Sequence, residues 1–332
     1  MKALIAKLPK AELHLHLEGT LEPELMFAIA KRNKIPMPYA SVEELSRAYR
    51  FSNLQEFLDI YYQGMNVLRH EEDYFDLARA YMERCAADRV THVEVFFDPQ
   101  GHTPRGVSFE TLIKGILGGL KHGEQAHGIT WRLIMSFLRH LSEDDGFETL
   151  DQAEPWLEQI VGVGLDSSET GHPPEKFSRL FGECRSRGLK LCMHAGEEGP
   201  PEFVRQALLD IGVDRIDHGN RAMEDASLVA EIVNRNMTLT VCPLSNLALN
   251  VIGRIEDNPI ALMLDAGIPA TVNSDDPAYF GGYMNANFEA VASGLGLSRG
   301  QVIQLAKNSF SGSFLDEAEK TRWIAEIDAL TA

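Results

Sequence analysis

The sequence predicts an α/β protein that folds as a closed (β/α)8 TIM barrel, with extra helices over the barrel mouth. Eight short β-like segments recur along the chain, segments with helical periodicity separate them, and polar residues follow the strand ends. Strands that alternate with helices indicate βα units and a parallel sheet. Eight such units favour a closed barrel, while an open doubly wound sheet is the alternative that the pattern leaves open.

Each predicted strand is a short, mostly apolar run. Helical periodicity lies between these runs, as in residues 54–67 and 74–87. The strands are expected at residues 11–17, 91–97, 131–137, 162–166, 189–194, 215–218, 238–242 and 270–273.

Two regions go beyond a plain barrel. Residues 21–90 are too many for one crossover helix, so this insert is expected to carry the extra helices over the mouth. Its part around residues 52–65 is the expected lid. Residues 298–330 are expected to form a helical tail with Ser298 as the N-cap.

Composition bounds both the architecture and the partners. The 332 residues contain 44% hydrophobic and 24% charged residues, and no linker divides them, so residues 1–332 are expected to form one domain. The net charge of −18 disfavours nucleic acid and anionic membranes as partners, because both attract basic surfaces. A small uncharged molecule fits this charge better.

The cysteines and the N-terminus indicate the cytoplasm. The four cysteines, at positions 85, 184, 192 and 242, form no C-x-x-C pair and no dense framework, so they are expected to be reduced. The opening segment has an apolar run too short for a signal peptide. No run reaches the length of about 18 apolar residues that a membrane helix needs.

Polar residues with catalytic chemistry stand at the ends of the predicted strands. In a barrel the carboxyl ends of the strands converge on one face, and that face hosts the active site. Residues that are far apart in the chain are therefore expected to share a pocket. They are His14, His16, Asp166, His194, His218, Asn246, Asp275 and Asp276.

Four of these residues suit a metal ion. His14 and His16 alternate on one strand, so their side chains point the same way. A lone H-x-H pair is a weak signal, but His194 and Asp275 at other strand ends complete a set of three imidazoles and one carboxylate. Such a set suits one Zn²⁺, with Fe²⁺ as the alternative ion.

Two further residues suit the handling of protons. A neutral imidazole at His218 can accept or orient a proton of a water molecule beside the metal. Glu197 follows His194 in the run His-Ala-Gly-Glu and offers a protonatable acid. Together with an activated water, this set fits hydrolysis at an electron-poor carbon. Neither a G-x-S-x-G elbow nor a Walker A run is present.

Five motifs in this order resemble the adenosine/adenine deaminase family of the amidohydrolase superfamily, over nearly the whole chain. They are PKAELHLHLEG, HAGE, RIDHG, CPLSN and NSDDP. The resemblance implies a barrel with one zinc ion held by His14, His16, His194 and Asp275.

The resemblance also implies the reaction. Glu197 would protonate purine N1, His218 would activate or orient the water, and Asp276 would hydrogen-bond N7. A metal-activated hydroxide would then attack C6, and ammonia would leave.

Two departures from the adenosine-specific pattern favour the adenine branch of that family. Glu18 stands where adenosine deaminases have an aspartate that helps to bind ribose, so its longer side chain is expected to close the sugar site and to accept a hydrogen bond from N9–H. Ser168, or its neighbour in the stretch Ser-Ser-Glu, is expected to contact N3. The run HAGEEGPPE also looks like the adenine branch.

The predicted activity is deamination of adenine to hypoxanthine and ammonia, in purine salvage. Deamination of adenosine or of an N6-substituted adenine is the first alternative. A cyclic amidohydrolase with the same barrel is less favoured, because no lysine at a strand end suggests a carbamylated bridge to a second metal. A binding protein without activity is disfavoured because the metal set and Glu197 are complete.

Overall fold

All eight predicted strands form, and they pair in chain order as one parallel sheet. The structure is a computed structural model that describes residues 1–332. Each neighbouring pair is parallel, so the open doubly wound order, in which the strand sequence reverses, is excluded. The strands are β1 (Lys10–His16), β2 (Val90–Phe97), β3 (Thr130–Leu138), β4 (Ile160–Asp166), β5 (Lys190–Ala195), β6 (Arg215–His218), β7 (Leu239–Val241) and β8 (Ala270–Val272).

The barrel closes just beyond the end of β8. An isolated parallel bridge joins Leu15 in β1 to Asp275. The backbone N–H of His16 donates to the carbonyl of Asp275 at 3.0 Å, and the N–H of Asp275 donates to the carbonyl of His14 at 3.2 Å. The last strand-end carboxylate is thereby fixed beside the first strand-end imidazoles.

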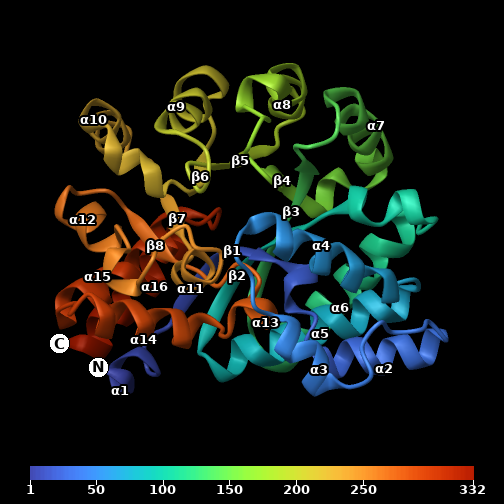
Figure 1. Ribbon diagram of the computed structural model, residues 1–332. Helices are drawn as coiled ribbons and strands as arrows, with labels where there is room; N and C mark the ends of the chain where they lie inside the picture. The colour runs from blue at the N-terminus through green and yellow to red at the C-terminus, as the bar shows by residue number, and fades with distance from the viewer.

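Helices surround the strands, as Figure 1 shows. Ser298 caps its helix as expected, because its hydroxyl accepts from the N–H of Gln301 and the Gln301 side chain reaches back. The helices outside the insert are α1 (Lys2–Ile5), α6 (Phe109–His127), α7 (Glu143–Ala153), α8 (Ser178–Ser186), α9 (Pro201–Arg205), α10 (Ala226–Asn234), α11 (Pro243–Ala248), α12 (Ile260–Asp265), α13 (Pro277–Phe280), α14 (Met284–Gly294), α15 (Arg299–Ser311) and α16 (Glu317–Thr331).

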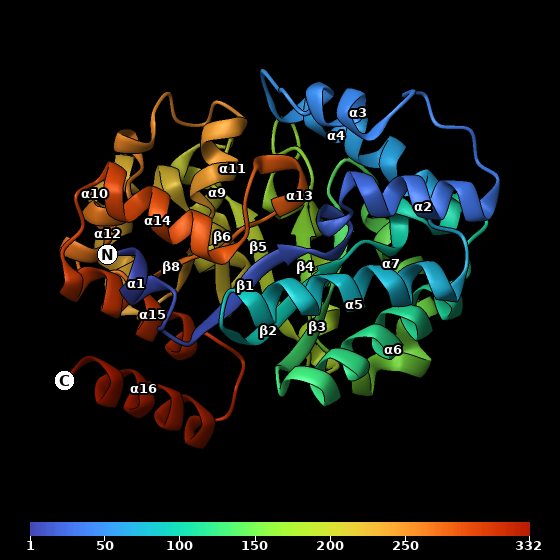
Figure 2. The same cartoon turned by 90° about the horizontal axis from the view of Figure 1, so that it is seen from below.

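The insert between β1 and β2 carries the predicted extra helices. They are α2 (Pro23–Asn33), α3 (Val42–Ala48), α4 (Leu54–Gly64) and α5 (Glu71–Ala87). Figure 2 shows α3 and α4 at one end of the barrel, while α5 runs along its side. Five side chains of α4 line the cavity at that end, so the segment expected as a lid forms part of the cavity wall.

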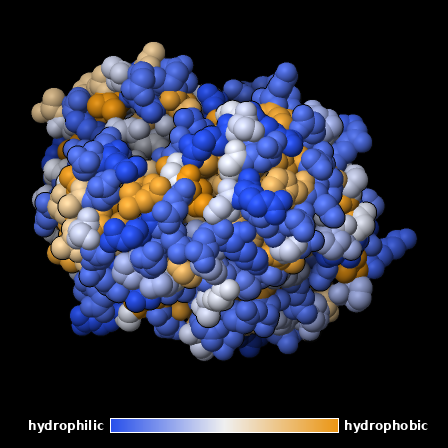
Figure 3. Space-filling view, turned by 90° about the horizontal axis from the view of Figure 1, so that it is seen from above, coloured by the Kyte–Doolittle hydropathy of each residue, from blue (hydrophilic) through white to orange (hydrophobic).

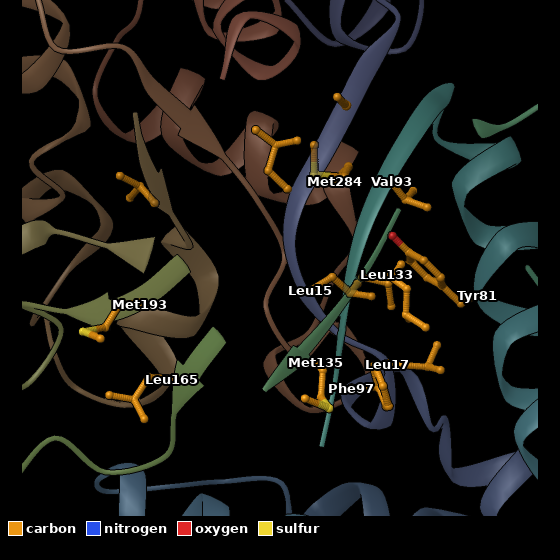
Figure 4. Packing of buried hydrophobic residues seen from close by; sticks show 14 of the residues in the cluster. Leu15, Leu17, Tyr81, Val93, Phe97, Leu133, Met135, Leu165, Met193 and Met284 are labelled. Carbon is orange, nitrogen blue, oxygen red and sulfur yellow. The ribbon is translucent and has the colours of Figure 1, made fainter. Parts of the chain in front are cut away.

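The strands sort their side chains by alternation. On β1, Leu13 and Leu15 lie in the hydrophobic cluster of 81 buried residues, whereas His14 and His16 face the barrel interior. Figure 4 shows Leu15 on β1 and Val93 on β2 on the side of the strands toward Tyr81 of α5. One strand thus contributes to packing with one face and to chemistry with the other.

The surface and the thiols agree with the composition. The face in Figure 3 is mainly hydrophilic, with hydrophobic residues in small separate groups. All four cysteines are free and buried, as expected. None of the helices combines the length and the apolar character that crossing a membrane requires.

Glycines allow α5 and α6 to pack closely. Gly115, Gly119 and Gly123 recur every four residues and so form one face of α6. A Cβ at Gly119 would lie 2.6 Å from both the Ala78 Cβ and the Phe75 carbonyl oxygen of α5. Because backbone atoms cannot rotate away as a side chain can, a methyl group here must push the two helices apart.

Gly119→Ala is therefore expected to lower the free energy of unfolding by about 1–3 kcal/mol, since overpacking outweighs the better helix propensity of alanine. Gly182 in α8 is the matched control, because it is exposed and a Cβ there would meet nothing within 4 Å. Gly182→Ala is expected to raise the stability by about 0.5–1 kcal/mol. Thermal unfolding of both variants checks this. Equal shifts of Tm would contradict the close-packing argument.

Candidate active site

A partly open cavity, with about 400 Å³ of atom-free space that includes open solvent, lies at the carboxyl ends of the strands. Its walls come from β1, β4, β5 and β6, from the segments after β2 and β8, and from α4. The structure thus brings strand-end residues from across the chain into one space. The lining residues are His16, Leu54, Phe57, Leu58, Tyr61, Tyr62, Asp98, Asp166, Ser167, His194, Glu197, His218, Leu249, Asp275 and Asp276.

Four donor atoms converge at the inner end of this site. The Nε2 atom of His194 lies 3.1 Å from His14 Nε2 and 3.2 Å from His16 Nε2. Asp275 Oδ1 lies 3.4 Å from His14 Nε2 and 3.5 Å from His16 Nε2. The four residues predicted as metal ligands therefore meet around one point.

Four of the six distances among these donors lie between 3.1 and 3.5 Å, close to the about 3.3–3.6 Å that separate two ligands of one zinc ion. Donor atoms that all lie within 4.8 Å of one another come from His14, His194, His218 and Asp275, and His16 forms a second such set with Asp275 and Asp276. Burial and the neighbouring His194 lower the pKa of His16 to about 3, which leaves its imidazole neutral. Burial raises the pKa of Asp275, but the adjacent His14 and His218 hold it well below its usual range. Neutral imidazoles and an ionised carboxylate are the forms that bind metals.

Polar side chains stand behind the histidines, on the Nδ1 side of the rings. The Thr240 hydroxyl donates to Asp217 Oδ1 at 3.0 Å and lies 2.9 Å from His14 Nδ1. Asp217 Oδ2 lies 3.6 Å from His194 Nδ1, and Asp166 Oδ2 lies 3.4 Å from His16 Nδ1. With a proton on each Nδ1, all three Nε2 lone pairs point toward the shared centre.

A buried arginine, Arg215, lies beside Asp217. Arg215 Nε lies 3.7 Å from Asp217 Oδ1, and another of its nitrogens donates to the carbonyl of Leu13 at 2.8 Å. The Nη1 atom of Arg215 forms an ion pair with Glu94 in β2. Burial raises the pKa of Asp217, but hydrogen bonding to His194 and the charges around it keep that pKa below the usual range. The motif Arg-Ile-Asp-His-Gly thus supplies both Asp217, which faces His194, and Arg215, which lies beside Asp217.

The two proposed proton-handling residues face each other. His218 Nε2 lies 3.4 Å from Glu197 Oε2 and 4.0 Å from Asp275 Oδ2. Burial and the adjacent His14 lower the pKa of His218 well below its usual value, so the ring is neutral. Burial and the charge of Asp275 raise the pKa of Glu197 well above its usual value. A neutral base and a neutral acid therefore stand side by side.

Backbone strain marks the same strand ends. His218 has φ of 63°, Asp275 has φ of 64° and Ser167 has φ of 71°. Residues with a Cβ rarely adopt this left-handed region, and such strain concentrates at functional sites. The turns that follow β4, β6 and β8 thereby direct these side chains into or beside the cavity.

Asp276 lines the cavity and packs directly against Gly19. A Cβ at Gly19 would lie 2.6 Å from the Asp276 Cβ, so only glycine lets the segment after β1 pass so close. Asp276 is buried and its Oδ1 has no hydrogen-bond partner. Burial and Asp275 raise its pKa well above the usual value. The carboxyl group is therefore free to pair with a ligand.

Glu18 and Ser168 do not line this cavity. Glu18 is buried, and Ser168 lines a neighbouring pocket that shares Leu58, Tyr62 and Ser167 with the cavity. Glu18 Oε1 accepts from the backbone N–H of Asp98 at 3.2 Å and lies 2.8 Å from His102 Nε2. The Ser168 hydroxyl donates to Glu198 at 3.1 Å, whereas its neighbour Ser167 lines the cavity. Of the nine residues predicted for the site, these two and the ligand His14 are not among the cavity-lining residues.

The sequence analysis missed Asp98, Tyr61 and the supporting pair Arg215 and Asp217. Asp98 directly follows β2, so the strand-end rule that found the other residues could have found it. Tyr61 lies on α4, and no strand position marks it. Arg215 and Asp217 stand within the RIDHG motif, but only the barrel interior shows what they contact.

The chain matches known proteins along its whole length. The Adenosine deaminase family profile matches residues 9–330. An adenine deaminase of Sphingopyxis alaskensis is 62% identical over 98% of this chain and 96% of its own. An adenine deaminase of Caulobacter vibrioides is 58% identical over 98% of this chain and 94% of its own.

Solved structures resemble the fold as closely. The crystal structure of an adenine deaminase from Arthrobacter aurescens superposes with a TM-score of 0.95 at 47% identity, covering 97% of this chain and 99% of that one. An amidohydrolase from Burkholderia ambifaria, solved with bound Zn, has a TM-score of 0.91 at 26% identity and covers 99% of this chain and 93% of its own.

Asp217→Asn is expected to weaken metal binding about 10- to 100-fold, because the amide cannot accept from His194 and balance Arg215 as the carboxylate does. Competition with a chromogenic chelator measures this without reference to activity. Asp144→Asn is the control, since Asp144 is exposed on α7. An unchanged metal affinity in Asp217→Asn would show that the contact does not orient the histidines.

Proposed function

Because the chain belongs to the adenosine deaminase family, we propose that it hydrolyses adenine to hypoxanthine and ammonia. The observation that carries the proposal is the content of one cavity: a converging set of three imidazoles and one carboxylate, with a protonated Glu197 and a neutral His218 beside it. The near full-length identity to adenine deaminases supports the substrate.

The protein is metal-dependent, and we propose one Zn²⁺ per chain. His14, His16, His194 and Asp275 would hold it, because the neighbouring donor atoms of this set lie 3.1–3.5 Å apart. The bound Zn in the related amidohydrolase supports this ion over Fe²⁺. When bound, the ion lowers the pKa of a water molecule from 15.7 to about 7 and so supplies a nucleophile at neutral pH.

Glu197 acts as the proton donor in this proposal. Because its raised pKa keeps a proton at neutral pH, it can donate to N1 of the base. A proton on N1 withdraws electron density from C6, where the oxygen of water must add. The carboxylate left behind is 3.4 Å from His218 Nε2 and so can exchange a proton with it.

His218 and Asp276 hold the two reacting partners. The neutral ring of His218 can accept a proton from the attacking water, or hold that water in line with C6. Asp276 keeps a proton for the same reason as Glu197, and N7 of adenine has only a lone pair to offer. A protonated Asp276 can therefore donate a hydrogen bond to N7. After water has added at C6, the amino group leaves as ammonia.

The walls of the cavity combine apolar and polar side chains. Leu54, Phe57, Leu58 and Tyr61 of α4 line the site next to the polar residues. Apolar walls with a few polar groups suit a purine ring. Ser167, the neighbour of Ser168, lines the cavity, so it is the one of these two serines that can face the substrate.

We also propose that the protein acts as one domain in the cytoplasm, in purine salvage. One hydrophobic cluster includes residues of the strands, the insert and the C-terminal helices, which supports a single folding unit. Four buried free thiols agree with a reducing compartment. The net charge of −18 agrees with a small-molecule substrate and disfavours a nucleic-acid partner.

Glu197→Gln is expected to lower kcat/KM for adenine about 10²- to 10⁴-fold, because the amide cannot donate a proton to N1 as an acid does. The wild-type rate should fall as the pH rises through the raised pKa of Glu197, and this alkaline limb should be absent in the variant. Zinc content should be unchanged. An unaltered pH profile would contradict the role of Glu197.

Ammonia release from the zinc-loaded protein tests the substrate directly. Adenine is expected to exceed adenosine and N6-methyladenine by orders of magnitude in kcat/KM. A preference for adenosine would mean that the cavity admits ribose, and the metal chemistry would still stand. A preference for N6-methyladenine would shift the assignment to N6-substituted bases.

A further inference from the structure

Asp98 is a buried carboxyl group that the proposed reaction does not use. It directly follows β2, is 2% exposed and lines the same cavity as Glu197 and Asp276. Its Oδ1 has no hydrogen-bond partner. The neighbouring carboxyl of Asp166 can share a proton with Asp98, and a donor group of the substrate is the other partner that the cavity offers to this buried oxygen.

The surroundings of Asp98 hold it in place. Its Oδ2 accepts from the Tyr61 hydroxyl of α4 at 3.4 Å. Its backbone N–H donates to Glu18 Oε1, which is in turn 2.8 Å from His102 Nε2. Glu18 therefore acts on this part of the cavity through the backbone of Asp98, although its own side chain does not line the wall.

One polar edge of the adenine ring has no protein contact in the proposed reaction. If Glu197 meets N1 and Asp276 meets N7, the remaining polar edge is N3 with N9–H, on the opposite side of the ring system from C6. This edge presents an acceptor and a donor side by side. A sugar on N9 removes the donor and adds bulk in the same place.

We propose that Asp98 is a specificity-determining residue that accepts the N9–H hydrogen bond and so selects a free base over an N9-substituted purine. The inference rests on the proposed deamination of adenine. Glu18 and Tyr61 are positioning residues for this contact. Both the ionised and the protonated form of a carboxyl group have an oxygen that can accept N9–H. The contact therefore does not depend on the protonation state of Asp98.

The protonation of Asp98 adds to the match. Burial and the charge of Glu18 raise its pKa to about 8. A carboxyl group that keeps its proton can accept N9–H with one oxygen and donate to N3 with the other. This bidentate pairing also explains why an amide could replace the acid, since Asn offers the same acceptor and donor.

The test compares adenine with 9-methyladenine, which differs only at N9. KM for adenine and the inhibition constant of 9-methyladenine are measured in zinc-loaded wild type, Asp98→Ala, Asp98→Asn and Glu18→Gln. Asp98→Ala is expected to raise KM for adenine about 10- to 100-fold, because a buried hydrogen bond is lost. Its affinity for 9-methyladenine should stay the same or improve. Asp98→Asn should restore most of the discrimination.

The outcomes separate three explanations. Equal losses for both ligands in Asp98→Ala, or an unchanged ratio between them, would overturn the inference. Loss of bound zinc in that variant would also overturn it, since donor atoms of Asp98, Asp166 and His16 lie within 4.8 Å of one another and could serve the metal. A larger change in Glu18→Gln than in Asp98→Ala would assign the contact to Glu18.

This design also keeps the two proposals apart. A wild-type protein that releases no ammonia from adenine would defeat the proposed function itself. A wild type that deaminates adenine, with discrimination unaffected at position 98, would defeat only the role of Asp98.

Discussion

The contact between Leu15 and Asp275 is the constraint on which the site depends. It closes the barrel, and its flanking hydrogen bonds join His16 and His14 of β1 to the segment after β8. Three of the four side chains that we propose as metal ligands are thereby placed next to one another. An open sheet with the same strands would leave the first and last strand ends at opposite edges.

Environment gives chemically similar carboxyl groups opposite tasks. Asp275 and Asp217 are surrounded by imidazoles and, at Asp217, by Arg215, so they remain ionised. Glu197 and Asp276 are buried beside other carboxylates, so they keep their protons. The ionised pair serves the metal and its ligands, and the neutral pair can donate to ring nitrogens. The position in the cavity, and not the residue type, makes this division.

Support for the metal ligands extends through the barrel interior. Glu94 pairs with Arg215, Arg215 approaches Asp217, and Asp217 faces the Nδ1 side of the histidines. This chain of contacts links β2, β5 and β6 to His14 on β1. The insert contributes from the other side, where α4 covers the cavity and Tyr61 reaches Asp98. The metal end is thus held by strands, and the end that meets the rest of the substrate by helices.

The sequence by itself determined the strands, the closed barrel and the residues at the strand ends. Periodicity of two or 3.6 residues is a local property, and barrel topology then gathers His16, His194 and Asp275 without further information. Only the tertiary structure decided that Glu18 accepts a hydrogen bond from the backbone of Asp98 and does not line the cavity, and that Ser167 rather than Ser168 lines it. These placements depend on side-chain contacts between distant segments, and a single sequence does not encode such distances in any local pattern.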